Sequence, residues 1–273
     1  MKKLVAFLMA MTMILCLFAG CAAEKTDPVH TTAGLPSKEG ITIPKRNVSL
    51  KNDPAADMML LFIYQGNCYV QYEIVQGTAI KGKRLGTVTG MIDEWTPADG
   101  YVELAGSAYG DFFEVEGYDP SFMLCMNEGE DAVMTYVCDS GFTVKQGADI
   151  LEKRFHFSEN RRVVWYRGRN ASYAGSRRYQ FTGSFDIVDE FIRQINEGEF
   201  VPRETLEGEL RNKNPRYELL LITKSGIPAT VYVFEDGYVC FSSFWDYCIW
   251  IPEETFNKMF DLMENHTDAT AVS

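Results

Sequence analysis

Histidine, the side chain most often used for acid–base chemistry and metal binding near neutral pH, occurs only three times in this chain. His30 and His266 lie near the two ends of the sequence, so His156 is the one histidine expected inside ordered structure. This count argues against a metal centre built from several histidines and against most histidine-based triads. We predict no metal site and no cofactor, and we expect His156 to be structural or solvent-facing.

Carboxylates are the other abundant groups capable of chemistry, and the chain has 38 of them. Two carboxylates about 5 to 10 Å apart across a cleft can hydrolyse a glycosidic bond. The sequence does not show which carboxylates face each other. An envelope hydrolase that uses paired carboxylates, with His156 as a helper, is therefore kept as the alternative function. It predicts a deep pocket with two facing acidic groups and a raised pKa in at least one of them.

The most informative pattern is a change of charge along the chain. Residues 85–144 contain twelve acidic side chains and no lysine or arginine, whereas residues 145–178 carry nine basic side chains among several aromatic ones. Arginine predominates there, and it binds carboxylates and phosphates bidentately and stacks on aromatic rings. The candidate ligand-binding residues are Arg161, Arg162, Trp165, Arg167, Arg169, Arg177 and Arg178.

Two interpretations of this basic segment remain open. In the first, its charges pair with the acidic sheet inside the domain, and each pair adds only modest stability. In the second, the basic face points outward and binds an anionic partner, namely lipid headgroups, an anionic surface polymer or an acidic protein. A separate aromatic group is either part of the core or an interface with another protein, and it comprises Phe244, Trp245 and Trp250.

The first residues have the pattern of an export signal. Lys2 and Lys3 are followed by an uncharged apolar run over residues 4–18, shorter than the roughly 20 residues that span a bilayer. The motif Phe18-Ala19-Gly20-Cys21 resembles the lipobox of bacterial lipoproteins. This resemblance implies that a diacylglycerol is attached to Cys21, which becomes the first residue after cleavage. We therefore expect a lipid-anchored protein on the extracytoplasmic face of the cell membrane.

The predicted domain organisation follows from composition. Residues 1–20 are the lipoprotein signal peptide, and residues 21–57 are rich in proline and charge, so we expect a flexible tether. We then predict a mainly β domain over residues 58–182, an α+β C-terminal region over 183–265 and a tail over 266–273.

The patterns of apolar residues predict an α+β fold whose antiparallel sheets are covered by two or three helices. Short apolar or alternating stretches separated by Gly, Asp, Asn and Pro are typical of antiparallel strands. Helices are predicted near residues 147–156, 184–197 and 252–264, where apolar side chains recur at helical spacing. A faint likeness between residues 60–63 and 219–222 leaves open whether the chain forms one domain or two similar small subdomains.

The disulfide state is left open. Five cysteines remain after Cys16 is removed with the signal and Cys21 is lipidated. Cys240 and Cys248 lie on a predicted hairpin, but a tight turn near residues 244 and 245 would place Cys240 opposite Ile249. Direct pairing of the two cysteines then needs a bulge. We expect most of the five to be buried thiols, and one disulfide is the alternative.

Net charge excludes one class of partner. Without Lys2 and Lys3, the mature chain has 24 basic side chains, out of the 26 in the sequence, against 38 acidic ones, a formal charge of −14. Such a chain repels phosphate backbones, so we exclude nucleic acid as a partner. The sequence thus predicts a non-catalytic binding or interaction module of the cell envelope, held at the membrane through the lipid on Cys21, without indicating its specific function.

Overall fold

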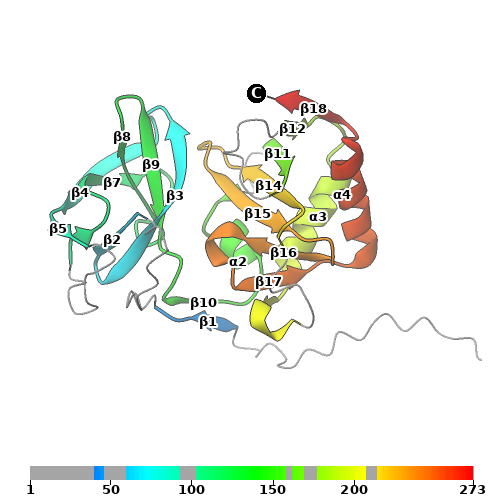
Figure 1. Cartoon of the computed structure of the whole chain (residues 1–273), viewed down its shortest axis with the longest axis horizontal. Helices are drawn as coiled ribbons and strands as arrows, with labels where there is room; N and C mark the ends of the chain where they lie inside the picture. The colour runs from blue at the N-terminus through cyan, green and yellow to red at the C-terminus, as the bar shows by residue number, and fades with distance from the viewer. Residues whose placement is uncertain are drawn as a thin grey trace, which may run out of the picture. The chain divides into compact units, whose positions relative to one another are not determined.

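The structure is a computed structural model that describes residues 40–45, 60–92, 103–157, 162–168, 177–206 and 214–272 (Figure 1). These residues belong to one compact unit, Gly34–Ser273. Strands make up 47% of the interpretable residues and helices 19%. The prediction of an α+β fold with its sheets covered by helices is therefore wrong, and the described part of the chain is mainly β.

The first sheet has eight strands and curls into a half-barrel (Figure 1). Its order is β4-β7-β8-β9-β3-β2-β6-β5, and its neighbours are antiparallel except for the short pair β5 and β6. The strands are β2 (Leu61–Tyr64), β3 (Asn67–Gln76), β4 (Lys81–Val88), β5 (Gly90–Met91), β6 (Ala105–Gly106), β7 (Gly110–Val115), β8 (Met123–Glu128) and β9 (Ala132–Val137).

Alternation of side chains buries both faces of the half-barrel at β8 and β9. Leu124 and Met134 pack on one face around Phe62 and Phe112, whose ring centroids are 5.1 Å apart. Neighbouring residues of the same strands, such as Val133, pack on the other face in the main core, which also contains residues of the second sheet. The second sheet and the short helix α2 (Ala148–Leu151) both contribute to this core, so the face that we expected helices to cover is buried mainly against other strands.

The second sheet also has eight strands, in the antiparallel order β13-β17-β16-β15-β14-β11-β12-β18. Its strands are β11 (Arg162–Arg167), β12 (Arg178–Phe181), β13 (Phe200–Pro202), β14 (Tyr217–Ile222), β15 (Pro228–Val233), β16 (Tyr238–Phe241), β17 (Tyr247–Trp250) and β18 (Ala269–Val272). The sheet thus draws strands from both sides of the predicted boundary at residue 183, and β18 lies in the segment predicted as a tail. The topologies of the two large sheets differ, so they are not the similar subdomains considered from the sequence.

A third, small sheet pairs β1 (Ile41–Ile43) with β10 (Phe142–Val144). Strand β1 lies within the segment that the sequence predicts to be a tether, and its Ile43 is buried in the main core. The apolar side chains of β1 explain this local order, because they remove apolar surface from water when β1 pairs with β10.

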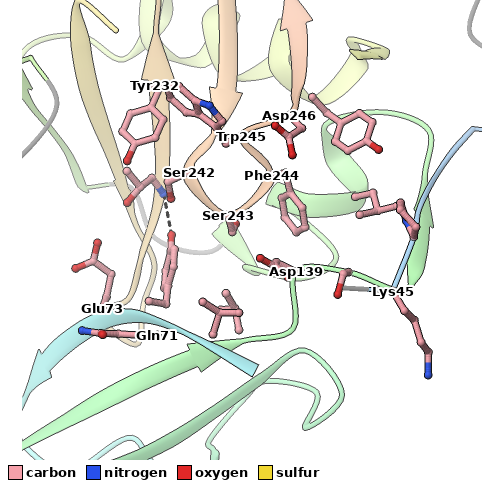
Figure 2. A pocket seen from close by; sticks show the side chains of 18 of the residues that line it. Lys45, Gln71, Glu73, Asp139, Tyr232, Ser242, Ser243, Phe244, Trp245 and Asp246 are labelled. Atoms are coloured by element: carbon pink, nitrogen blue, oxygen red, sulfur yellow. Dashed lines mark hydrogen bonds between the residues drawn. The ribbon is translucent and has the colours of Figure 1, made fainter. Parts of the chain in front are cut away.

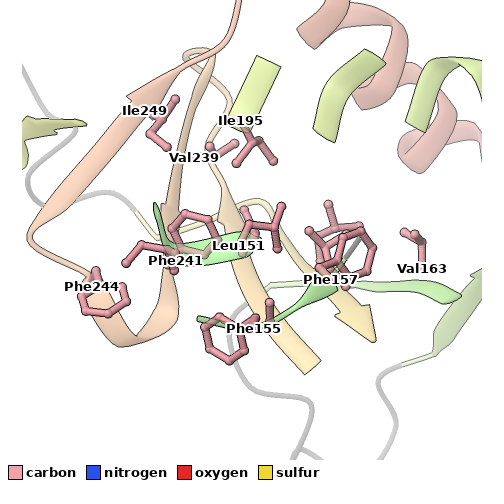
Figure 3. Close-up of a cluster of buried hydrophobic side chains, with 14 of the residues drawn as sticks. Leu151, Phe155, Phe157, Val163, Ile195, Val239, Phe241, Phe244 and Ile249 are labelled. Atoms are coloured by element: carbon pink, nitrogen blue, oxygen red, sulfur yellow. The ribbon is translucent and has the colours of Figure 1, made fainter. Parts of the chain in front are cut away.

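The helices of the described residues are short: α2 (Ala148–Leu151), α3 (Asp186–Glu197) and α4 (Glu253–Asn265). Helices α3 and α4 lie side by side on one face of the second sheet, where Phe191 and Met259 join the main core (Figure 1). Figure 3 shows Leu151 of α2 in the same core with Val239 and Phe241 of β16. None of these described helices is long and apolar enough to cross a membrane.

The hairpin β16–β17 pairs one residue away from the register of a tight turn. Cys240 lies directly opposite Cys248, and a disulfide bond joins them. Five residues, Ser242–Asp246, connect the strands and include the short 3-10 helix η5 (Ser242–Phe244). Compared with a two-residue turn, a five-residue loop shifts the pairing by one residue, so that Cys240 faces Cys248 instead of Ile249. No bulge is therefore needed. Outside this pair, Cys68, Cys125 and Cys138 are buried thiols.

Candidate functional site

A cavity of about 790 Å³ lies between strand β3 of the half-barrel and the second sheet. Figure 2 shows Gln71 and Glu73 on the β3 side, with Tyr232, Ser242 and Trp245 across from them. Sites for small ligands in proteins commonly enclose about 300–1,000 Å³. The cavity therefore has the size of a small-molecule site.

One wall of the cavity is a row of side chains across the second sheet. Glu218 of β14 pairs with Tyr166 of β11 on one side and with Tyr232 of β15 on the other. Residues directly opposite in a sheet project from the same face. Thr230 lies two positions before Tyr232 and faces the same way, whereas Leu219 projects from the other face into the main core. Alternation along β14 and β15 thus separates the cavity face from the core face.

The opposite wall depends on a β-bulge in β3. The pairing of β3 with β9 shifts between residues 71 and 74, so that Tyr72 and Glu73 stand opposite the single residue Thr135. The buried Thr135 hydroxyl accepts a hydrogen bond from the Glu73 N–H at 3.1 Å and donates one to the Glu73 carbonyl oxygen at 2.8 Å. A bulge re-aims side chains. Tyr72 and Glu73 therefore both line the cavity, although neighbours in a regular strand point to opposite faces.

Tyr72 connects the two walls. Its hydroxyl donates a hydrogen bond to the carbonyl oxygen of Pro228 at 2.8 Å and accepts one from the N–H of Thr230 at 3.1 Å. Burial raises the pKa of Tyr72, so its hydroxyl keeps its proton at neutral pH. These contacts fix the spacing between β3 and β15 on one side of the cavity.

Two carboxylates, Glu73 and Glu218, share this cavity. Glu218 is 7% exposed, and Glu73 is half-buried. The pKa of Glu73 is raised to about 7, mainly by burial and secondly by the negative charge of Glu218, while the positive charge of Arg178 acts in the opposite direction. At neutral pH about half of the Glu73 side chains hold a proton.

The rest of the lining includes aromatic side chains, hydroxyl groups, the carboxylates of Asp139 and Asp246, and Lys45. The Arg203 guanidinium carbon lies 4.0 Å from the ring centroid of Trp245, which fixes this ring at the wall. Thr230 is 2% exposed, and its Oγ1 has no hydrogen-bond partner among the described residues; the same is true of the buried Oγ of Ser243. A buried polar group without a partner costs about 1–3 kcal/mol. A ligand that bonds these oxygens would recover part of that cost.

The three aromatic residues of the predicted interface have separate positions. Phe244 is buried and packs edge-on against Phe142, with ring centroids 5.3 Å apart. Phe244 and Trp245 both line the cavity, whereas Trp250 is 43% exposed and does not. The structure thus brings two of the three residues to the candidate site.

The predicted arginine site is only partly assembled. Arg162, Arg177 and Arg178 are exposed, as a binding face requires. Trp165, in contrast, is fully buried and belongs to the main core, so it is not part of a surface. Arg161 and Arg169 lie outside the described residues.

A second cavity, of about 330 Å³, contains two members of this arginine group, Arg167 and Arg177. Arg167 pairs with Glu264 at 3.1 Å, and Arg216 pairs with the same carboxylate at 3.0 Å. His266 also lines this cavity and stacks on Tyr179. Because Glu264 offsets part of the arginine charge, this cavity offers less positive potential than the sequence pattern indicates.

Other chemistry considered from the sequence has little support in the described residues. His156 is exposed and does not line the large cavity, so the helper role considered for it has no geometric basis. No group of three or more His, Cys, Asp or Glu side chains in this part of the chain is arranged to hold a metal ion.

Comparison of the chain with protein-family models, with curated proteins and with solved structures finds no match. Function is therefore inferred from the cavity itself. Its main acidic residues, Glu73 and Glu218, are not singled out by the sequence patterns discussed above. The available signal is local: Glu73 is the one charged residue of the segment Cys68–Val75, and Glu218 is the one charged residue of Tyr217–Ile222. A charged side chain that is withdrawn from water is costly unless it is paired or functional.

Proposed function

We propose that this protein is a non-catalytic binding protein of the cell envelope, anchored at the extracytoplasmic face of the membrane by lipid on Cys21. In this proposal the globular part binds a small polar ligand in the cavity between β3 and the second sheet. One observation carries it: a cavity of about 790 Å³ combines acidic side chains, aromatic rings and buried hydroxyl oxygens without partners. An apolar wall with a few converging polar groups is typical of ligand sites.

The proposal includes a second contact, with an anionic surface polymer, through exposed arginines. Arg162, Arg177 and Arg178 are the members of the predicted basic group that support it, because they are exposed in the described residues. Guanidinium groups bind phosphate and carboxylate groups bidentately. This contact would hold the protein near the polymer and leave the cavity available.

The binding proposal is tested by ligand retention. The full-length chain, purified in detergent, is incubated with a small-molecule extract and a digest of cell-wall polymer, and retained compounds are identified by native mass spectrometry. Ser243→Trp places a large ring in the cavity, and Lys224→Trp places the same ring on an exposed turn. We expect the parent protein and Lys224→Trp to retain the same compound and Ser243→Trp to lose it. Equal retention by both variants would show that the cavity is not the site.

Hydrolysis by paired carboxylates is the second candidate function. It is favoured by one observation, namely that Glu73, with a pKa of about 7, shares a cavity with the negatively charged Glu218. A carboxyl group with a raised pKa beside a second carboxyl group is an arrangement that acid–base hydrolysis uses. The test is the release of new reducing ends from wall polymer. If the protein only binds, the parent protein should release no more reducing ends than Glu73→Gln does. Release by the parent protein that is lost in both Glu73→Gln and Glu218→Gln would favour hydrolysis.

A further inference from the structure

We infer that the cavity selects an organic cation, whose protonated amine is held between Glu73 and Glu218 and whose remaining part lies toward Trp245. This inference rests on the proposed function, because it names the chemical class of ligand for the same cavity. It is carried by the charge of the lining, by the positions of the two glutamates and by the unpartnered hydroxyl oxygen beside them.

The charge of the lining excludes an anionic ligand. Four carboxylate residues line the cavity, and Lys45 is the only lysine or arginine among the described lining residues. The Lys45 side chain is exposed, and its Nζ donates to the carbonyl oxygen of Gly66 at 3.3 Å, outside the cavity lining. Like charges repel strongly where water is partly excluded. The four carboxylates are Glu73, Asp139, Glu218 and Asp246.

The groups facing Glu73 leave room for one additional positive charge. Tyr72 on β3 and Tyr166 on β11 are neutral at physiological pH, because burial raises the pKa of both hydroxyls. Arg178 on β12 is the cation whose charge reaches Glu73, but it is exposed and does not line the cavity. Since Glu218 repels the ionised form of Glu73, an ammonium group between them would relieve this repulsion.

The position of Thr230 fits an amine better than a bare metal ion. Its Oγ1 is a buried acceptor without a partner, and Thr230 projects from the same sheet face as Glu218. An ammonium group has three N–H donors. This number of donors matches the two carboxylates and the hydroxyl oxygen that line the cavity. The aromatic and apolar lining near Trp245 then contacts the uncharged part of the ligand.

Proton release is the distinguishing consequence. An ammonium group beside Glu73 favours its ionised form, so binding transfers the glutamate proton to the buffer. With the pKa of free Glu73 at about 7, binding at pH 7 releases about half a proton per ligand, and at pH 8.5 almost none. The affinity consequently rises between about pH 6 and pH 8 and then becomes constant.

The experiment is isothermal titration calorimetry of the full-length chain in detergent. The cationic probes are putrescine, spermidine and tyramine, and the neutral matches are 1,4-butanediol for putrescine and tyrosol for tyramine. Titration at pH 7 in two buffers of different ionisation enthalpy gives the number of protons released. We expect at least one amine to bind at least tenfold more tightly than its alcohol. We also expect Glu73→Gln to abolish proton release and Glu218→Gln to weaken binding, with Glu116→Gln, at an exposed site, as the matched control.

Three results would overturn the inference: equal affinity for an amine and its alcohol, no binding of any amine at millimolar concentration, or unchanged proton release in Glu73→Gln. If Glu73→Gln does not fold, the test is the ratio of amine affinity to alcohol affinity in Glu218→Gln. A ratio equal to that of the parent protein would contradict the inference. Failure of this inference can be distinguished from failure of the binding proposal. Retention of a neutral compound that Ser243→Trp abolishes would keep the binding proposal and reject only the cationic ligand.

Discussion

Thr135 and Glu73 show how single side chains decide the chemistry of the cavity. Thr135 is completely buried, and its hydroxyl bonds both the N–H and the carbonyl oxygen of Glu73. These bonds hold the bulge that turns Glu73 toward Glu218. The position of the carboxylate therefore depends on a hydroxyl group of the neighbouring strand.

The first prediction concerns this hydroxyl. Thr135→Val keeps the shape of the side chain but removes both hydrogen bonds, so we expect the free energy of unfolding to fall by about 1–3 kcal/mol. Urea unfolding measures the change. Thr143→Val is the matched control, because Thr143 is exposed and its hydroxyl bonds only the exposed Thr42. A loss at Thr135 no larger than that at Thr143 would show that the bulge does not need the hydroxyl.

The second prediction concerns Glu73 and pH. Its pKa is about 7 in the folded protein against an ordinary value of 4.5, so the folded state binds the proton more tightly and the ionised form destabilises the fold. Stability due to Glu73 is fully present below pH 4.5 and is lost as pH rises through 7. Because Gln mimics the protonated form, we expect Glu73→Gln to be more stable than the parent protein at pH 8 and equal to it near pH 4. Urea unfolding across this range is the measurement, with exposed Glu116→Gln expected to show no such trend.

At the scale of elements, the loop Ser242–Asp246 between strands β16 and β17, together with Tyr247 of β17, forms part of the cavity wall. The disulfide between Cys240 and Cys248 closes this hairpin beneath Trp245 and Phe244. Both cysteines are at most 1% exposed. The loop conformation that presents the aromatic side chains is thus tied covalently at its base.

The third prediction follows from this disulfide. Constraining a loop of about nine residues stabilises the folded state by roughly 2–3 kcal/mol in the chain-entropy model. We expect reduction of the disulfide to lower the free energy of unfolding by that amount. The reduced protein should therefore unfold at a lower urea concentration. Alkylation of the unfolded mature protein should label Cys68, Cys125 and Cys138 before reduction, and also Cys240 and Cys248 after it. Labelling of all five without reductant would rule out the disulfide.

At the scale of the whole molecule, location and charge decide what the protein can meet. The formal charge of the whole sequence is −12, yet exposed arginines are present on β11 and β12 of the second sheet. A lipid on Cys21 would keep the chain at the envelope, so that the partners available to these arginines would be envelope components.

The fourth prediction tests the lipid. Bacterial cells that express the full chain are grown with a labelled fatty acid, and the protein is isolated. We expect label on the parent protein and none on Cys21→Ala. Cys16→Ala, which changes a cysteine inside the signal, is the matched control and should keep the label. Equal labelling of Cys21→Ala would mean that the lipobox resemblance is misleading.

The fifth prediction tests the polymer. We expect the protein to sediment with cell-wall fragments at about 50 mM salt and to be released at about 300 mM, because screening weakens exposed charge pairs. Replacement of Arg162, Arg177 and Arg178 by Ala should reduce retention at low salt. Replacement of three exposed lysines by Ala removes the same charge and should reduce this retention less. The three lysines are Lys83, Lys145 and Lys224. Equal effects would indicate general charge attraction and contradict an arginine site.

The sequence by itself determined many of the local elements, although not β1 or β18. Helices α3 (Asp186–Glu197) and α4 (Glu253–Asn265) lie close to the ranges 184–197 and 252–264 that apolar spacing predicts. Most strands of the half-barrel fall where apolar residues alternate between turn residues. These features depend on residues that are close in the sequence, so the sequence alone is sufficient to predict them.

Tertiary structure alone decided the curl of the first sheet, the bulge at Tyr72 and Glu73, and the meeting of Glu73 with Glu218. Each depends on pairing between segments far apart in the sequence, and a shift of one residue turns a side chain to the other face. The register of β3 against β9 aims Glu73, and the register of β14 against β15 aims Glu218. Local patterns contain neither register, which is why the sequence suggested an arginine surface and the fold formed an acidic cavity.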